Sequence, residues 1–167
     1  MTSKKIIQKC KLIKLVITDV DGVLTDGGMY YSDKGEILKK FNTKDGMGIE
    51  LLHNASIKTI FVTGENSKIV KMRAKKVKAD ECYINIKQKE KIFSKICKKY
   101  NVKSVNVAYI GDDINDLKIM NLVGLTACPY DAEKQIKLIS DFKCKKNGGK
   151  GAFREFANVI LDNTINS

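Results

Sequence analysis

The stretch LIKLVITDVDG, residues 12–22, joins an apolar run to two aspartates that follow it directly. Residues 12–18 are almost continuously apolar, which predicts a β-strand buried on both faces, as in a parallel sheet. Asp19 and Asp21 follow the carboxyl end of this strand, where open α/β sheets bind their ligands. The stretch therefore predicts both the fold class and the place of a functional site.

Outward from this strand, strand-like and helix-like patterns alternate along the chain. The further elements expected are strands over residues 57–62, 105–110 and 122–127, and helices over residues 46–54, 67–77, 89–100, 131–139 and 152–161. Such alternation is typical of an α/β fold, a doubly wound parallel sheet flanked by helices, and residues 1–167 are expected to form one such domain. Between the first strand and the first helix, residues 27–41 predict a β-hairpin insertion.

The composition is that of a soluble protein with one hydrophobic core. Hydrophobic residues make up 43% of the 167 residues, which is enough to fill the core of a single domain. No apolar run is long enough to span a bilayer, and residues 1–11 lack the apolar part of a signal peptide. We therefore expect a cytoplasmic protein without a membrane partner. Five cysteines without a CxxC pair argue against a disulfide framework and a structural zinc site.

The net charge of +12 raises the question of a nucleic-acid partner. The basic residues are almost all lysines, and they are spread along the chain rather than gathered in a patch interleaved with aromatic residues. We therefore expect no nucleic-acid partner, and the positive charge is better suited to attracting a small anionic substrate.

Polar residues also follow the next two predicted strands. Thr-Gly-Glu comes after the second strand, at residues 63–65, and Gly-Asp-Asp-Ile-Asn-Asp comes after the third, at residues 111–116. Carboxylates that converge at one edge of a sheet are costly to bury unless they are paired or bind a cation. Oxygen ligands favour Mg²⁺, and Asp112 is expected to complete a magnesium site next to Asp19.

The spacing of Asp19 and Asp21 separates their roles. If they alternate along an extended segment, their side chains point in different directions, so that one can attack a substrate and the other can protonate a leaving oxygen. Gly22 then permits a tight exit from the strand. An EF-hand is excluded because Leu24 and Tyr30 stand where it needs glycine and glutamate, and neither GxGxxG nor GxxxxGK[ST] is present.

Five stretches in order along the chain, DVDGVLTDG, FNTKDGMGI, VTGENS, VAYIGDDINDLKIM and GGKGAFREF, resemble the haloacid dehalogenase-like phosphatases. Within that superfamily they are similar to the branch without a cap domain, which hydrolyses phosphorylated sugar acids. The resemblance implies that Asp19 is a nucleophile forming an aspartyl-phosphate, and that Asp21 is the general acid and then the base. It implies Mg²⁺ bound by the Asp19 carboxylate, the Asp21 backbone carbonyl and Asp112.

The same resemblance implies that Thr63 and Lys89 hold the transferring phosphoryl group. Because the stretch around Lys89 is rich in lysine, a lysine two residues before or after it could take that place instead. Asp113 and Asp116 would orient Asp112 and Lys89.

Substrate contacts are implied at residues Asn42, Thr43, Lys44, Asp45, Gly46, Gly64, Glu65, Arg73 and Lys76. Two arginines of the phosphatases for octulosonate 8-phosphate are replaced here by Glu50 and Glu65. Glu65 together with Lys76 instead resembles the branch that acts on nonulosonate 9-phosphates, toward which we lean. Random substitution at exposed positions would also explain Glu65 and Lys76, so the eight-carbon substrate remains an alternative.

The resemblance further implies a homotetramer in which the hairpins associate. A neighbour's C-terminal segment, within residues 147–167 and near 148–154, would then cover the site. A noncatalytic tetramerisation module, like the domains fused to sugar-acid cytidylyltransferases, is the alternative. The intact set of Asp19, Asp21, Thr63, Lys89 and Asp112 argues against it.

Overall fold

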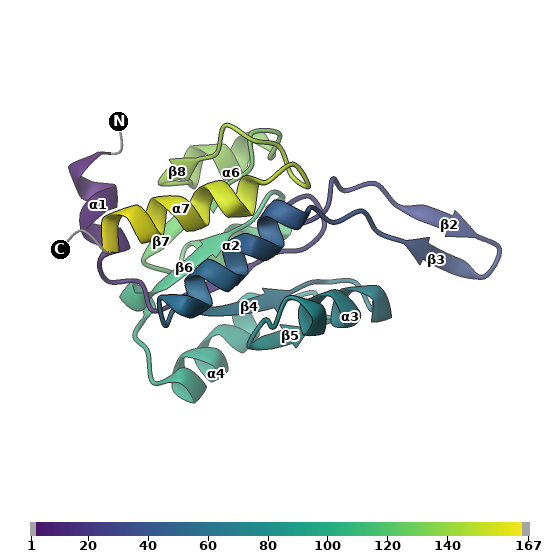
Figure 1. Ribbon diagram of the computed structural model, residues 1–167, viewed down its shortest axis with the longest axis horizontal. Coiled ribbons are helices and arrows are strands. Elements are labelled where there is room, and N and C mark those ends of the chain that lie inside the picture. The colour runs from purple at the N-terminus through teal and green to yellow at the C-terminus, as the bar shows by residue number, and fades with distance from the viewer. Residues whose placement is uncertain (1–2, 165–167) are drawn as a thin grey trace.

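A six-stranded parallel sheet runs through the centre of the computed structural model, which describes residues 3–164 (Figure 1). The strands, in sheet order, are β5 Glu81–Tyr83, β4 Lys58–Val62, β1 Leu15–Thr18, β6 Val107–Ile110, β7 Leu125–Cys128 and β8 Phe142–Lys143. The chain builds outward from β1 in both directions, so the predicted doubly wound sheet is confirmed. Residues 1, 2 and 165–167 of the predicted domain and C-terminal segment lie outside the described residues.

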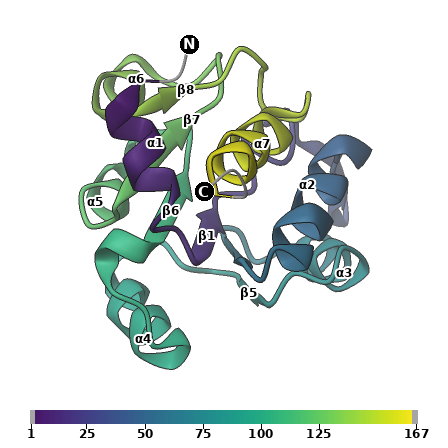
Figure 2. The same ribbon diagram turned by 60° about the vertical axis from the view of Figure 1, so that its left-hand side comes forward.

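Helices cover both faces of the sheet (Figure 2). Their bounds are α1 Lys4–Cys10, α2 Thr43–Asn54, α3 Lys68–Lys76, α4 Glu90–Tyr100, α5 Leu117–Met120, α6 Lys134–Ile139 and α7 Ala152–Thr164. The buried side chains of α1, α2, α3 and α7 form one hydrophobic cluster, and those of α4, α5 and α6 form a second cluster across the sheet. None of the described helices has both the length and the apolar character needed to cross a membrane.

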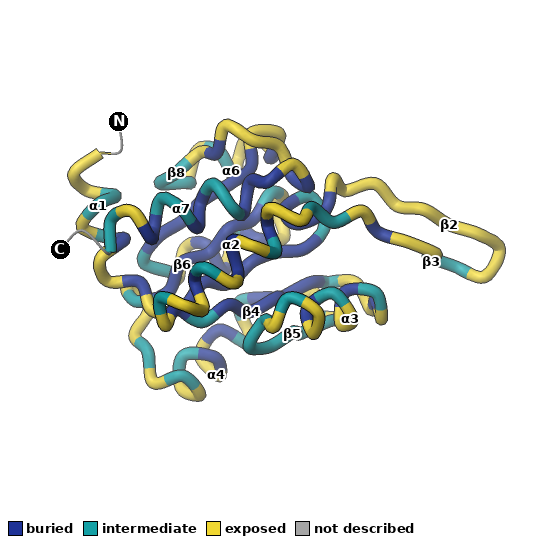
Figure 3. Tube along the Cα trace, in the orientation of Figure 1, coloured by how far each residue is buried: buried dark blue, intermediate teal, exposed yellow. Residues whose placement is uncertain are grey.

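The first strand is buried on both faces, as its sequence predicts. Leu15 and Ile17 pack into the cluster on one side of the sheet, and Val16 packs into the cluster on the other. All three residues have no exposed surface, and Figure 3 shows the strands as the buried centre of the molecule. The strand begins at Leu15 rather than residue 12, because Leu12 lies in the exposed turn that follows α1.

The predicted hairpin consists of β2, Tyr30–Ser32, and β3, Gly35–Leu38, which pair antiparallel. It projects away from the sheet and is exposed along most of its length (Figures 1 and 3). In the described residues, this hairpin is the insertion between β1 and α2, and no cap domain covers the site.

Some short elements have no signal in the sequence. The patterns do not predict α1, β5, the 3₁₀ turn Ile114–Asp116 with α5, or β8. The strands β5 and β8 have three and two residues, which is too short for an alternating pattern to be recognised. They add the two edges of the sheet without changing the position of the site.

Candidate active site

The acidic residues that follow three strands meet at one edge of the sheet, as predicted. They line a cavity of about 170 Å³ at the carboxyl ends of β1, β4 and β6. The residues that line it are Asp19, Asp21, Met29, Thr63, Gly64, Glu65, Asp112, Asp113 and Asn115. The sheet order places β1 between β4 and β6, which is why Asp19 lies between the two other strand ends.

The segment after Asp19 is not extended, so that part of the sequence prediction is wrong. Residues 21–24 form a tight turn in which the Val20 carbonyl accepts hydrogen bonds from three backbone N–H groups, and Gly22 has φ +90°. A side chain at Gly22 would also collide with the Asp112 carboxylate. An extended segment would, moreover, have pointed residues two apart to the same side rather than to different sides. In the observed turn, Asp19 and Asp21 both line the cavity.

Lys89 is the lysine that reaches this site. It lies just before α4, and its fully buried Nζ is 2.5 Å from Asp19 Oδ1 and 2.6 Å from Asp116 Oδ1. Lys87 and Lys91, the two alternatives, are exposed. Burial alone would lower the pKa of Lys89, but Asp19 and Asp116 raise it above its ordinary value, so the ammonium group stays charged.

The buried carboxylate of Asp116 accepts hydrogen bonds from three groups around the cavity. Its Oδ1 accepts hydrogen bonds from Lys89 and from the Tyr109 hydroxyl at 2.6 Å, and its Oδ2 accepts the Asp112 backbone N–H at 3.0 Å. Asp113, predicted to share this role, is exposed and accepts a hydrogen bond from the Ile114 N–H. It lines the same cavity, but its carboxylate caps the short 3₁₀ turn.

Asp19, Asp112 and Asp116 form a group that could hold a cation, with ligand atoms within 4.8 Å of one another. Asp112 Oδ1 is buried without a hydrogen-bond partner. Burial, followed by the neighbouring carboxylates, raises the pKa of Asp112 to about 9, and burial raises that of Asp19 to about 6. The oxygens of Asp116 already accept three hydrogen bonds, so Asp19 and Asp112 are the carboxylates that fit the predicted Mg²⁺ site.

Thr63 and Asp21 face each other across the cavity. Thr63 lies at the end of β4, and its Oγ1 is 3.4 Å from Asp21 Oδ2. The other Asp21 oxygen, Oδ1, accepts a hydrogen bond from Lys39 Nζ at 2.7 Å. The sequence gives no sign of Lys39, because it stands next to Lys40 in a hairpin and no spacing distinguishes the two.

The predicted substrate residues of the first helix divide into two kinds. Thr43 and Lys44 are exposed, whereas the side chains of Asn42 and Asp45 accept hydrogen bonds from backbone N–H groups of the chain. Asn42 accepts the Lys44 N–H as the cap of α2, and the buried Asp45 accepts the Arg154 N–H at 2.9 Å, next to the start of α7. The Asn42 cap explains why α2 begins at Thr43 rather than residue 46.

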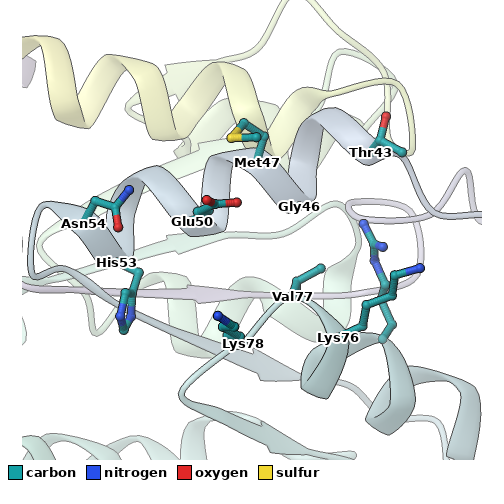
Figure 4. Close-up of a pocket in the computed structure, with 10 residues that line it drawn as sticks. Thr43, Gly46, Met47, Glu50, His53, Asn54, Lys76, Val77 and Lys78 are labelled. Carbon is teal, nitrogen blue, oxygen red and sulfur yellow. The ribbon is translucent and has the colours of Figure 1, made fainter.

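Arg73 and Lys76 do not line the cavity that contains Asp19. Together with Gly46 they line a separate groove of about 520 Å³ between α2 and α3 (Figure 4). Arg73 donates to the Asn42 carbonyl at 3.1 Å and lies over the Phe41 ring. Glu65 and Gly64, by contrast, do line the Asp19 cavity.

The glycine-rich segment before α7 packs on the turn at residues 21–24. The Gly149 N–H donates to the Val23 carbonyl at 3.0 Å, and the Asn42 side chain donates to the Gly149 carbonyl. Gly148 and Gly149 are buried, and a side chain at Gly148 would collide with the backbone of Gly22. Gly148 and Gly149, which belong to the segment predicted to cover a neighbouring site, are therefore packed against their own chain.

Comparison with known proteins gives a consistent picture. Residues 81–155 match the family model for haloacid dehalogenase-like hydrolase. The chain is 38% identical, over 154 residues, to the 3-deoxy-D-manno-octulosonate 8-phosphate phosphatase of Haemophilus influenzae, and the match covers 92% of this chain and 86% of that protein.

Two solved structures are similar over nearly the whole chain. The cobalt-bound deoxy-D-mannose-octulosonate 8-phosphate phosphatase of H. influenzae has a TM-score of 0.92 and 38% identity, covering 94% of this chain and 92% of that one. The phosphatase of Moraxella catarrhalis, in complex with a magnesium ion, a phosphate ion and 3-deoxy-D-manno-octulosonate (KDO), has a TM-score of 0.93 and 34% identity, covering 97% and 93%.

Proposed function

Because this chain is a phosphatase that belongs to the haloacid dehalogenase-like hydrolase family, we propose that it hydrolyses the phosphate ester of a 3-deoxy-2-ulosonic acid through an aspartyl-phosphate on Asp19. One observation carries the proposal. The carboxylate of Asp19 is held by the buried Lys89 at the edge of a cavity that also contains Asp21, Thr63 and Asp112. This set offers a nucleophile, an acid, and positive charge where a phosphoryl group would sit.

The reaction follows from these positions. Asp19 attacks phosphorus, the ester P–O bond breaks, and Asp21 gives a proton to the leaving sugar oxygen. Asp21 then takes a proton from the water that attacks the aspartyl-phosphate, which restores Asp19 and releases inorganic phosphate. Lys89 neutralises charge on the phosphoryl oxygens, and Thr63 donates a hydrogen bond to them. Mg²⁺ held by Asp19, Asp112 and the Asp21 backbone carbonyl would neutralise further charge.

The eight-carbon substrate, octulosonate 8-phosphate, is favoured by the similar proteins, which are phosphatases for that ester. A nonulosonate 9-phosphate is the second candidate, and the observation in its favour is the position of Glu65 in the Asp19 cavity. A glutamate there can accept hydrogen bonds from the hydroxyl groups of a longer sugar chain.

The decisive experiment is phosphate release from a panel of sugar-acid 8- and 9-phosphates, with and without Mg²⁺. We expect release that depends on Mg²⁺ and is abolished in Asp19→Asn, while Asp33→Asn in the exposed hairpin turn keeps full activity. A phosphorylated peptide containing Asp19, trapped by rapid quenching and detected by mass spectrometry, would support the intermediate. No release from any ester, by a chain that still assembles, would support the noncatalytic alternative.

The hairpin supports a homotetramer. Tyr31 is 61% exposed and Ile37 is 55% exposed on a hairpin that projects from the domain, and such apolar surface is usually covered by a partner. We expect tetramers in analytical ultracentrifugation and smaller species for the Tyr31→Lys/Ile37→Lys variant.

An exposed part of the C-terminal segment, such as Lys150, is then the part expected to approach a neighbour's site. A cytoplasmic location stays a prediction.

A further inference from the structure

Lys39 is a buried charge at the foot of the hairpin, one residue after the end of β3. Its side chain has no exposed surface and lies between two carboxylates, with Nζ 2.7 Å from Asp21 Oδ1 and 2.6 Å from Glu36 Oε1. Burial of a lysine at this depth is unfavourable unless its charge is fully paired. Both of its partners therefore matter to where the side chain lies.

A continuous chain of polar contacts passes through Lys39. Ser67, the residue before α3, donates its hydroxyl hydrogen to Glu36 Oε2 at 2.7 Å, and the other oxygen of Glu36 binds Lys39. Lys39 in turn binds Asp21, whose second oxygen faces Thr63. The hairpin, the start of α3 and the turn at residues 21–24 are thus joined through Glu36 and Lys39.

This arrangement divides the two oxygens of Asp21 between two tasks. Oδ1 is occupied by Lys39, and Oδ2 is directed toward Thr63 and the cavity, where a leaving oxygen would lie in the proposed reaction. Next to the turn at residues 21–24, Thr25 Oγ1 also lies 3.4 Å from Asp21 Oδ1. The contact with Lys39 Nζ is shorter, at 2.7 Å, and joins opposite charges, so Lys39 is the stronger of the two restraints on this rotation.

We propose that Lys39 is a positioning residue of the phosphatase reaction, which holds Asp21 so that Oδ2 can deliver its proton to the leaving oxygen. The inference rests on the proposed function and deepens it, because it gives the hairpin a part in the chemistry. Without the ammonium group, Asp21 and Glu36 would face each other as like charges, and Asp21 would rotate away from the cavity.

The test is Lys39→Met, which keeps a long unbranched side chain without the charge, compared with Lys40→Met. Lys40 is the neighbouring lysine, with a side chain 54% exposed, and its nearest carboxylate is that of Asp26 at 3.5 Å. Two substrates are compared in rapid-mixing experiments, the sugar-acid phosphate and p-nitrophenyl phosphate. The sugar alkoxide needs a proton in order to leave, whereas p-nitrophenolate leaves without one.

We expect Lys39→Met to slow the first step with the sugar-acid phosphate by about tenfold or more, part of the roughly 10²–10⁴-fold that general acid catalysis contributes. The initial burst of p-nitrophenolate should keep its wild-type rate, and the Kd of each substrate, taken from the concentration dependence of the first-step rate, should change little. Lys40→Met should behave as the wild type. A purely structural role would slow both first steps equally.

Glu36→Gln provides a second, milder variant, because it keeps Lys39 and Asp21 and weakens only the outer contact. We expect the same selective loss, smaller in size, and this variant decides the question if Lys39→Met does not fold. Equal losses on the two substrates, or no loss, would overturn the inference. A wild-type chain that releases no phosphate from any ester would overturn the proposed function itself, which separates the two failures.

Discussion

Lys89 Nζ lies 2.5 Å from the Asp19 carboxylate and 2.6 Å from that of Asp116, with its side chain fully buried. One positive charge therefore pairs with both the proposed nucleophile and the carboxylate of Asp116. This double pairing links the stability of the fold to the chemistry, because neither carboxylate has another cation within ion-pair distance among the described residues.

Replacing Lys89 should damage both properties. In Lys89→Met, two buried carboxylates lose their partner, so we expect the free energy of unfolding to fall by about 3–5 kcal/mol. Turnover should fall at least about 10²-fold in protein that remains folded, since charge stabilisation of the phosphoryl group is lost. Urea unfolding and phosphate release measure the two effects, and Lys91→Met, at an exposed position, is the matched control. Unchanged stability would show that the buried pair is not needed for the fold.

Magnesium should stabilise the protein even without substrate. The unpartnered Asp112 Oδ1 and the crowded carboxylates around it are the features that a divalent cation would satisfy. At a Mg²⁺ concentration 100 times its Kd, binding adds about 2.7 kcal/mol to the free energy of unfolding. A thermal-unfolding series with Mg²⁺ should show a rising Tm, with KCl at equal ionic strength as the control. Asp112→Asn should reduce the rise, and an equal rise in that variant would place the metal elsewhere.

The stability of the protein should depend on pH through Asp45. Burial raises the pKa of Asp45 from 3.8 to about 6, although the Arg154 N–H opposes this by donating to the carboxylate. The folded state therefore holds this proton more tightly than the unfolded chain, so the contribution of Asp45 to stability falls as pH rises from about 4 to 6. The full loss is about 3 kcal/mol for a shift of about two pKa units.

The asparagine of the Asp45→Asn variant cannot ionise, so the variant should lack the pH-dependent contribution of Asp45 to the free energy of unfolding. The difference in free energy of unfolding between the variant and the wild type should grow from pH 4 to 6 and then stay constant. Denaturant unfolding of both proteins across that range measures it. Two parallel stability curves would contradict the prediction.

The preference for a nine- or eight-carbon substrate should depend on Glu65. If its carboxylate contacts the end of a nine-carbon chain, Glu65→Arg should change the ratio of kcat/KM for the nine- and eight-carbon esters by about tenfold toward the eight-carbon ester. Asn66→Arg introduces the same charge at the neighbouring exposed residue and is the control. An unchanged ratio would remove Glu65 as a determinant of chain length.

The parts of the site that follow strands could be predicted from sequence, because a parallel sheet brings its carboxyl ends together whatever the rest of the chain does. Asp19, Thr63 and Asp112 are of this kind. The turn after Asp19 could not be read from the alternation of two aspartates, since the conformation of Gly22 decides it.

Sequence patterns also do not reveal the contacts that side chains of the site make with segments distant in sequence. Lys39 reaches Asp21 only because the hairpin returns to the sheet beside it, and Asp45 reaches Arg154 only because α2 packs on α7. A lysine in a hairpin and an aspartate in the first turn of a helix are both ordinary at exposed positions. Their burial, which decides what they do, depends on packing over a long separation in sequence.

The contact between Gly149 and Val23 has a consequence for how the protein is made. The strand that precedes Asp19 is the first strand of the sheet to leave the ribosome, but the turn beyond it is closed by Gly149, which is synthesised more than a hundred residues later. Its sheet neighbours, β4 and β6, also come later. A nascent chain therefore carries Asp19 and Asp21 long before the turn at residues 21–24 is closed, and that turn can be completed only after Gly149 has been synthesised.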